Sequence, residues 1–509
     1  MKQLILPLAA ASLIIACTQM GNSNHKGSDS TGNSTSSDTT TAVVVRDESI
    51  NEANAYSDLF LDNAAIDSFV RKENLNSAEA STLRRFYDVR SNQFAWLASD
   101  GLTEQGRGLW SLYAESGTPD KRLKEKMDTL LQQDSLMISK NDTSAVQLEL
   151  TLTKLLFRYI QSNKKGIVNT SNVYSLVPRK KQDALQLADS ILNKQTSTQY
   201  ANNKDYNGLK QQLSIYYTAA KNGGWQAVSG KGLKKGVRSP AVIALKKRLA
   251  ATGDYTTSDT SNIFSDSLAT AIKDVQRHNG LASSGVVNDS LIKILNVPAE
   301  QRVEQILINL NRTLWMPIRD SNYIMVNIPS FTLYAYEGSN RIFEMPVVVG
   351  KEGTSTVMFS GKINQIVFNP TWNIPRSIVQ NEILPKMKTD KSYLKKKNIE
   401  VVSEKDTIPT LRQLPGKDNP LGKVKFLFPN TFDIYLHDTP DRNLFKRKDR
   451  ALSHGCIRVA DPAKFAQYLL QNQSGWTENK IREAMNSGKG QTVAVKNTKV
   501  VYITYYTVW

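Results

Sequence analysis

The sequence predicts a multidomain α+β protein with three folded parts: a helical scaffold domain, a small three-helix domain, and a mostly β domain built as an antiparallel sandwich or barrel. Three observations support this class. Apolar residues recur at spacings of three and four through about residues 43–225. Short helical segments joined by Gly turns fill residues 230–297. Strand-like runs bounded by turn residues occupy about residues 320–509.

The first residues are typical of an export signal. Lys2 precedes an apolar run, residues 4–16, that is too short to span a bilayer comfortably. Cys17 follows a small residue and resembles the lipidated first residue of a mature bacterial lipoprotein, which predicts a signal peptide at 1–16 and a membrane anchor in the cell envelope, on the periplasmic side. A simple cleaved signal or a short anchor is the alternative.

The segment after Cys17 is low in sequence complexity. Residues 17–42 are almost entirely Ser, Thr, Asn, Gly and Asp, so they bury too little apolar surface to offset the entropy of ordering. We expect a disordered tether there. The net charge of +18 fits an anionic surface or polymer outside the cell, such as wall or lipid headgroups. Nucleic acid is not expected as a partner, because there is no compact basic and aromatic module and the chain is exported.

The scaffold region carries no catalytic motif. Its helical pattern is clearest in three segments, residues 59–70, 148–160 and 184–192. The aromatic patch between Tyr87 and Trp96 is expected in the core. We therefore interpret residues 43–225 as structural.

The region 230–297 predicts a compact bundle of three short helices. Ser239-Pro240 is a common helix start, and Gly253, Gly280 and Gly285 mark turns. The pattern of Leu, Val and Gly resembles the small peptidoglycan-binding module of cell-wall enzymes, and an unspecialised three-helix domain is the alternative. His278 is expected on the surface of the second helix.

The last region switches to short β-rich runs. They lie at residues 323–328, 331–336, 343–349, 363–368, 432–436 and 500–509. A Lys-rich insertion at about 381–420 interrupts them. An insertion of this length in a β domain is often a functional lid, and a solvated charged loop is the alternative.

Scarce reactive side chains concentrate in this last region. The chain has 2 Cys and 4 His, and Cys456, His454 and His437 fall within one short window. A thiol with a pKa of about 8.5 needs a nearby imidazole to become a nucleophile. We expect His437 and Cys456 to meet across neighbouring strands, with the backbone oxygen of Asp438 orienting the imidazole.

The residues beside Cys456 complete this candidate site. Gly455 allows close approach, and its N–H and that of Cys456 are candidate oxyanion donors, each worth about 3 kcal/mol. Arg458, two residues on, is placed to hold a carboxylate. The alternatives are a buried, inert cysteine or a zinc site, which would need carboxylate ligands because this region has no further Cys or His. We expect no metal and no cofactor.

The spacing from His437 to Ser453-His454-Gly455-Cys456 resembles the signature of the L,D-transpeptidases, the cysteine enzymes that cross-link peptidoglycan. Residues 372–385 and 411–426 resemble the segments on either side of a capping insertion in the large, scaffold-bearing branch of that family. The resemblance implies Cys456 as nucleophile and His437 as proton donor and acceptor. Ser453 and His454 would shape the pocket, and the resemblance extends to Trp372 as a substrate-binding residue.

The resemblance also implies a reaction. Cys456 would attack the carbonyl before the terminal D-alanine of a tetrapeptide stem, and the amine of a second stem would resolve the thioester into a 3→3 cross-link. Water as acceptor would give an L,D-carboxypeptidase, and another amine would attach a protein. Carbapenems are expected to acylate Cys456. A non-catalytic wall-binding lipoprotein and a cysteine endopeptidase of the wall are the rival functions.

Overall fold

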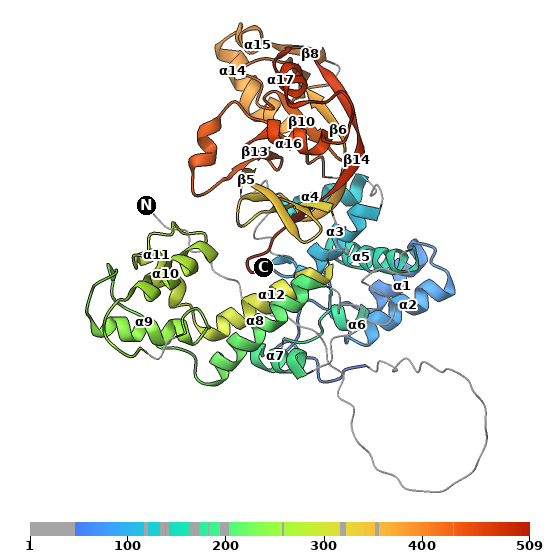
Figure 1. Ribbon diagram of the computed structural model, residues 1–509. Coiled ribbons are helices and arrows are strands. Elements are labelled where there is room, and N and C mark those ends of the chain that lie inside the picture. Colours follow the sequence, from blue (N-terminus) through green and yellow to red (C-terminus); the bar gives the residue numbers. More distant parts are fainter. Residues whose placement is uncertain are drawn as a thin grey trace, which may run out of the picture. The chain divides into compact units, whose positions relative to one another are not determined.

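The computed structural model describes residues 46–116, 121–132, 138, 142–162, 173–181, 183–193, 203–256, 259–315, 322–351, 356–404, 406–430 and 432–509 (Figure 1). The predicted signal peptide, Cys17 and the tether lie outside these residues. The chain divides into two units. The first unit holds the helical regions, and the second unit comprises residues 110–136 and 318–506. No helix of the described ranges is long and apolar enough to cross a membrane.

The first unit is helical, as the sequence predicts. Its first part consists of α1 (Asn63–Lys72), α2 (Ser77–Asp88), the start of α3 (Glu104–Ser116), α5 (Thr143–Ser162), α6 (Val173–Leu176), α7 (Ala184–Asn193) and α8 (Lys204–Lys221), with the short hairpin β1 (Leu97–Ala98) and β2 (Gly101–Leu102). Local sequence sets the helix starts. Asn76, for example, caps α2 and forms a reciprocal capping box with Glu79.

A buried carboxylate organises the aromatic patch of this unit. Glu149 on α5 accepts hydrogen bonds from the backbone N–H groups of Ala95 (2.6 Å), Trp96 (3.0 Å) and Leu97 (3.1 Å) and from the hydroxyl of Tyr87 (3.0 Å). The patch is buried, as predicted from its spacing. Burial raises the pKa of Glu149 to about 7, although the N–H donors oppose this shift. Glu149 therefore fixes the segment 95–97 to α5.

Glu149→Gln is expected to lower the free energy of unfolding of this unit by about 2–4 kcal/mol, because an amide cannot accept from all of these donors and its NH₂ group would face them. Glu52→Gln, at an exposed position, is the matched control. The pKa of Glu149 is about 7 in the folded protein, above its ordinary value of 4.5. The folded state therefore holds this proton more tightly than the unfolded state does, and the free energy of unfolding should fall as pH rises from about 4.5 through 7. Hydrogen exchange of the amides of Ala95 and Trp96 measures both effects, and unchanged exchange in Glu149→Gln would contradict the assignment.

The three-helix bundle has the predicted form. It contains α9 (Pro240–Ala250), α10 (Asp266–His278) and α11 (Asp289–Leu295), around a core that includes Val242, Leu245 and Leu291. His278 ends α10 and is exposed, as predicted. The helix α12 (Ala299–Trp315) follows the bundle.

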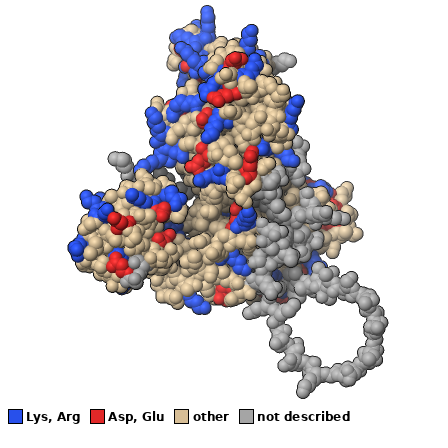
Figure 2. All heavy atoms as spheres, in the orientation of Figure 1, with Lys and Arg blue, Asp and Glu red and all other residues tan. Residues whose placement is uncertain are grey.

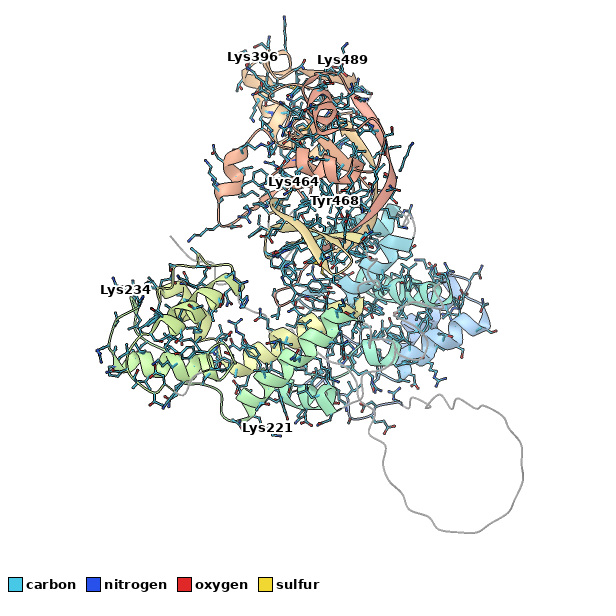
Figure 3. The ribbon with its side chains drawn as sticks, in the orientation of Figure 1. Lys221, Lys234, Lys396, Lys464, Tyr468 and Lys489 are labelled. Atoms are coloured by element: carbon cyan, nitrogen blue, oxygen red, sulfur yellow. The ribbon has the colours of Figure 1, made fainter. Side chains whose placement is uncertain are left out.

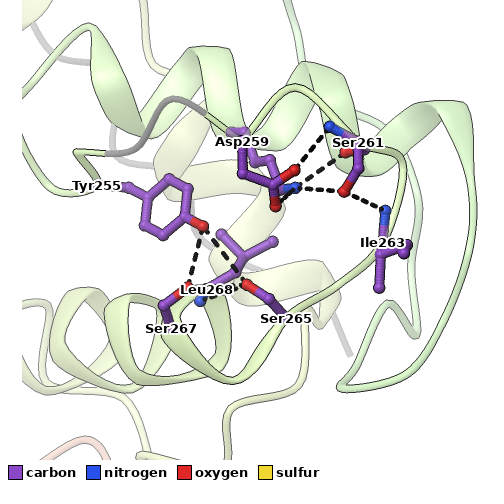
Figure 4. A network of polar contacts seen from close by, with 8 residues as sticks. Tyr255, Asp259, Ser261, Ile263, Ser265, Ser267 and Leu268 are labelled. Atoms are coloured by element: carbon purple, nitrogen blue, oxygen red, sulfur yellow. Dashed lines mark hydrogen bonds and ion pairs between the residues drawn. The ribbon is translucent and has the colours of Figure 1, made fainter.

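Polar contacts hold the loop between α9 and α10 of this bundle (Figure 4). Lys246 Nζ contacts Asp259 (2.6 Å) and the carbonyl of Ser261 (2.9 Å), and the Tyr255 hydroxyl lies 3.2 Å from the hydroxyl of Ser267. The nearly buried Lys246 is thereby satisfied within its own domain. We therefore read this network as structural.

The second unit is built on one large sheet (Figure 1). Its strands are β3 (Asn322–Asn327), β4 (Thr332–Glu337), β5 (Asn340–Gly350), β6 (Phe359–Phe368), β10 (Val424–Leu427), β11 (Leu436–His437), β12 (Ala451–Ser453), β13 (Ile457–Val459) and β14 (Gln491–Thr504), in the order β12-β5-β13-β11-β10-β6-β14-β3-β4. β4 also pairs with β5, so the sheet closes on itself. The helices α16 (Pro462–Leu470) and α17 (Glu478–Asn486) pack on its core.

The predicted β architecture is confirmed, with differences in detail. The pairs β11–β13, β12–β5 and β14–β3 are parallel, so the sheet is mixed and not purely antiparallel. The predicted strand 432–436 is reduced to β11, and the last strand ends at Thr504. These differences arise because strand direction and length depend on partners that are distant in the sequence.

The insertion is a folded subdomain and not an irregular charged loop. It contains β7 (Trp372–Asn373), α13 (Arg376–Ile378), the π-helical turn η1 (Val379–Ile383), α14 (Leu384–Thr389), α15 (Tyr393–Lys396), β8 (Ile399–Ser403) and β9 (Thr410–Gln413). The three strands form a separate sheet, and Ile374, Val379 and Leu411 belong to its own core. It begins about ten residues earlier than the sequence predicts, because Trp372 pairs with Gln413.

Basic side chains are prominent on the insertion (Figure 2). Lys386, Lys388, Lys395 and Lys396 are exposed on α14 and α15, and Figure 3 labels Lys396 there. Part of the net charge of +18 is therefore carried by this subdomain. Such a surface is suited to an anionic polymer.

Candidate active site

Three neighbouring strands present the candidate residues on one face of the sheet. Phe426 of β10, Leu436 of β11 and Ile457 of β13 point into the core. Because side chains alternate along a strand, the adjacent residues Lys425, His437 and Arg458 face the other way. In the register, Lys425 pairs with His437 and His437 with Arg458. His437 therefore lies between two cationic residues.

His437 is buried, and one of its ring nitrogens is already engaged. Nδ1 lies 2.5 Å from the backbone oxygen of Asp438. Since a carbonyl can only accept, Nδ1 carries the hydrogen and Nε2 remains available as a base. Burial, followed by the charges of Arg458 and Lys425, lowers the pKa of His437 to about 3, although the hydrogen bond to Asp438 partly opposes this shift. The imidazole is thus neutral at rest.

The carboxylate of Asp438 fixes the backbone that orients His437. It is buried and accepts hydrogen bonds from the N–H groups of Lys423 (2.8 Å) and Thr439 (2.7 Å). Arg442 forms an ion pair with it. The structure therefore places Asp438 as a positioning residue.

Cys456 is the free cysteine of the described residues and is partly exposed. Its sulfur lies 3.7 Å from the backbone oxygen of Asp433. Desolvation raises the pKa of the thiol, and hydrogen bonds from the backbone and hydroxyl of Tyr435 oppose this only in part. Burial and the charge of Cys456 likewise raise the pKa of Tyr435. At rest, Cys456 is therefore a thiol and His437 a neutral imidazole.

The loop before Cys456 is held by hydroxyl groups. Ser453 Oγ donates to the carbonyl of Cys456 (2.6 Å) and accepts from the N–H of Gly455 (3.2 Å). Thr356 Oγ1 donates to the carbonyl of Gly455 (2.7 Å). In this conformation the Gly455 N–H, an expected oxyanion donor, donates to Ser453 Oγ, and its role towards an oxyanion stays a prediction. The Cys456 N–H, by contrast, has no partner among the residues described.

The register also corrects the expected pairing of His437 and Cys456. Leu436 lies opposite Ile457, so Cys456 is displaced by two residues from the position opposite His437 and lies beside Tyr435 instead. The centre of the Tyr435 ring is 5.6 Å from the centre of the His437 ring, and Tyr435 also forms hydrogen bonds with Cys456. Tyr435 was not among the predicted site residues, although its spacing of two residues from His437 indicates a shared strand face.

The other predicted residues contact or belong to the insertion. His454 is about half exposed, and its Nε2 is 3.7 Å from Glu382 of η1 in the insertion. Trp372 lies on β7 of the insertion and packs against the core there. Lys425 was not among the predicted site residues either, because its pairing with His437 depends on the register between two strands. Within the described ranges, no cluster of three His, Cys, Asp or Glu residues could hold a metal ion.

Comparison with known families agrees with this geometry. Residues 321–501 match the L,D-transpeptidase catalytic domain, residues 81–213 a scaffold domain, and residues 238–295 a peptidoglycan binding domain. The chain contains an L,D-transpeptidase catalytic domain. In this L,D-transpeptidase domain, the matched residues include Cys456, His437 and the large sheet except for the last three residues of β14.

Individual relatives are similar over part of the chain. A Haemophilus influenzae protein named as an L,D-transpeptidase is 35% identical over 204 residues, which are 37% of this chain and 41% of that protein. The match thus spans about two fifths of that relative's length. The solved L,D-transpeptidase of Stackebrandtia nassauensis is 18% identical over 48% of this chain and 90% of that one, with a TM-score of 0.20. L,D-transpeptidase 3 of Mycobacterium tuberculosis, solved with a faropenem-derived adduct, is 12% identical over 36% and 60%, with a TM-score of 0.20.

The resting thiol of the L,D-transpeptidase domain should react slowly at neutral pH. Because burial raises the pKa of Cys456 above 9.0, alkylation of the full-length protein by iodoacetamide should keep accelerating beyond pH 9. Peptide mapping of Cys456 over a pH series measures this rate, with N-acetylcysteine as the control thiol. A plateau near pH 6 would contradict the prediction, since it would indicate a preformed thiolate and imidazolium.

Proposed function

We propose that this protein is an L,D-transpeptidase that forms 3→3 cross-links in peptidoglycan through a thioester on Cys456. The observation that carries the proposal is the free thiol of Cys456, which contacts Tyr435, with His437 two residues further along the neighbouring strand between two cationic residues. The matched catalytic and peptidoglycan binding domains support the same substrate class.

In the first half of the reaction, His437 Nε2 takes the thiol proton as sulfur attacks the carbonyl before the terminal D-alanine. Because the resting thiol is protonated and the imidazole neutral, proton transfer and attack are coupled. In this proposal the Cys456 N–H stabilises the developing oxyanion. The tetrahedral intermediate collapses as His437 returns its proton to the leaving nitrogen, which releases D-alanine and leaves a thioester.

In the second half, the side-chain amine of another stem attacks the thioester. His437 accepts a proton from this amine and returns it to sulfur, so the thiol is regenerated and an amide bond is formed. If water attacks instead, the product is a tripeptide and the enzyme acts as an L,D-carboxypeptidase. If a protein amine attacks, that protein becomes attached to the wall.

We also propose that the protein acts as a lipoprotein of the cell envelope, anchored through Cys17 and facing the periplasm. The tether at 17–42 would give the catalytic domain reach, and the basic insertion favours approach to an anionic polymer. Carbapenems should acylate Cys456, because their strained carbonyl presents the same kind of electrophile to the thiol.

Intact-protein mass spectrometry of the full-length protein with a disaccharide-tetrapeptide tests the function. The expected result is a thioester adduct on the wild type and none on Cys456→Ala, followed by dimer and free D-alanine. Release of D-alanine with tripeptide but no dimer would indicate the carboxypeptidase. Retention on peptidoglycan without adduct or D-alanine would refute the proposed enzyme and favour the binding lipoprotein.

A further inference from the structure

Lys425 and Arg458 are cationic groups that form no salt bridge among the described residues, although the charge of Asp441 acts on Arg458 from a greater distance. Lys425 is half-buried, and its Nζ lies 5.8 Å from the centre of the Tyr435 ring. No acidic side chain in the described part of the chain forms a salt bridge with it. Arg458 is also half-buried, and its Nε is buried without a hydrogen-bond partner among those residues. Half-burying two cations without ion-pair partners costs free energy, which a bound anion would offset.

Both cations flank His437 in the sheet. Lys425 of β10 is opposite His437 on one side, and Arg458 of β13 is opposite it on the other. Neighbouring strands are about 4.8 Å apart, so both side chains emerge about one strand from the imidazole. The charges of both residues also act on Cys456. Any anion bound between them therefore lies beside the reacting atoms.

The proposed reaction places one particular anion there. The leaving nitrogen must approach His437 within hydrogen-bonding distance to receive its proton. In a terminal D-alanine, one carbon separates this nitrogen from the carboxylate, so the carboxyl carbon is about 2.5 Å from the nitrogen. The carboxylate is thus confined to the surroundings of His437, where Lys425 and Arg458 are.

We propose that Lys425 and Arg458 form a clamp for the free carboxylate of the terminal D-alanine, and so make the enzyme selective for donor stems that end at that residue. The inference rests on the proposed function. The planar guanidinium of Arg458 can hold a carboxylate through two hydrogen bonds, and Lys425 adds a point charge from the other side. In a stem with one more residue, this carboxylate is replaced by a neutral amide, and both cations remain unpaired.

Substrate binding would also change the basicity of His437. The pKa of His437 is lowered by burial and by the charges of Arg458 and Lys425. A bound carboxylate offsets both charges, so the imidazole becomes more basic when a correct donor is present. The clamp would therefore link recognition of the terminal carboxylate to activation of the thiol.

The test compares two donors that differ only at the clamped group: a disaccharide-tetrapeptide ending in D-alanine, and the same compound ending in D-alanine amide. Thioester formation on the full-length protein is followed by mass spectrometry at several donor concentrations. The wild type should be acylated about 10- to 100-fold more efficiently by the acid than by the amide. This comparison needs no mutation, so it does not depend on a variant that folds.

The variants assign the selectivity to Lys425. Lys425→Met should lose about 10-fold or more in efficiency with the acid and change little with the amide, and Lys425→Arg should recover most of the loss. Lys464→Met is the matched control, because Lys464 also lies over an aromatic ring, Phe343 (5.1 Å), but is exposed on α16 (Figure 3). It should behave as the wild type does.

Three results would overturn the clamp. Equal acylation of the wild type by acid and amide would refute it while leaving the proposed function intact. An equal loss with both donors in Lys425→Met would assign Lys425 a structural role or a general effect on the thiol. No adduct with either donor would refute the proposed function, and the clamp with it.

Discussion

Replacing His437 with glutamine is expected to slow acylation of Cys456 by about 10²- to 10⁴-fold. Glutamine can keep a hydrogen bond from its amide to the Asp438 carbonyl, the contact made by Nδ1 at 2.5 Å, but it supplies no base for the thiol. The burial of His437 should be largely preserved, so the loss reports chemistry more than folding. Single-turnover formation of the thioester, measured by mass spectrometry, gives the rate.

Two further histidine variants calibrate this result. His278→Gln, on the exposed end of α10, should acylate at the wild-type rate. His454→Gln should have a smaller effect than His437→Gln, because its side chain is half exposed and its 3.7 Å contact is with Glu382 of the insertion. Acylation of His437→Gln within a factor of three of the wild type would show that another group activates Cys456.

Gly422→Ala should impair both stability and activity. A Cβ at Gly422 would lie 2.5 Å from Asp438 Cγ, and the backbone has φ of +60°, where alanine is strained. The clash must displace the carboxylate that accepts from Lys423 and Thr439, and with it the carbonyl that orients His437. We expect a loss of about 2–4 kcal/mol in unfolding free energy and about 10- to 100-fold in acylation rate.

Gly338→Ala separates the clash from the backbone strain. Gly338 has the same φ of +60°, and a Cβ there would meet nothing within 4 Å. This variant should lose about 1 kcal/mol and keep the wild-type acylation rate. Thermal unfolding and single-turnover acylation of the two variants provide the comparison. Equal losses in both would mean that the Asp438 contact has no special importance.

The sequence was sufficient to name the candidate residues but not to predict their arrangement. Cys456 and His437 could be named because reactive residues are scarce and closely spaced in this chain. Their offset could not be predicted, because it follows from the parallel pairing of Leu436 with Ile457. The position of Lys425 beside His437 could not be predicted either, because it depends on the pairing of β10 with β11, and an irregular segment separates these two strands in the sequence. Register is a tertiary property, and local pattern does not fix it.

In the fold, too, local elements could be predicted and long-range pairing could not. Helical periodicity was enough to locate α1, α5 and α7, since one buried face repeats every turn. Closure of the sheet through β4 and β5 could not be predicted, because the backbone hydrogen bonds between these strands leave no periodic pattern in the sequence. The insertion was recognised from its lysines, while the apolar residues of its own core, such as Leu411, were too sparse to indicate a folded subdomain.

The insertion leaves and re-enters the sheet at adjacent points. β6 ends at Phe368 and β10 begins at Val424, and these two residues are paired neighbours. The gap could therefore be closed by a short turn without changing the order or direction of any strand in the large sheet. The insertion can therefore be exchanged as a unit. Insertions from other chains could be grafted between the same two residues while Cys456, which lies just before β13, keeps its place in the large sheet.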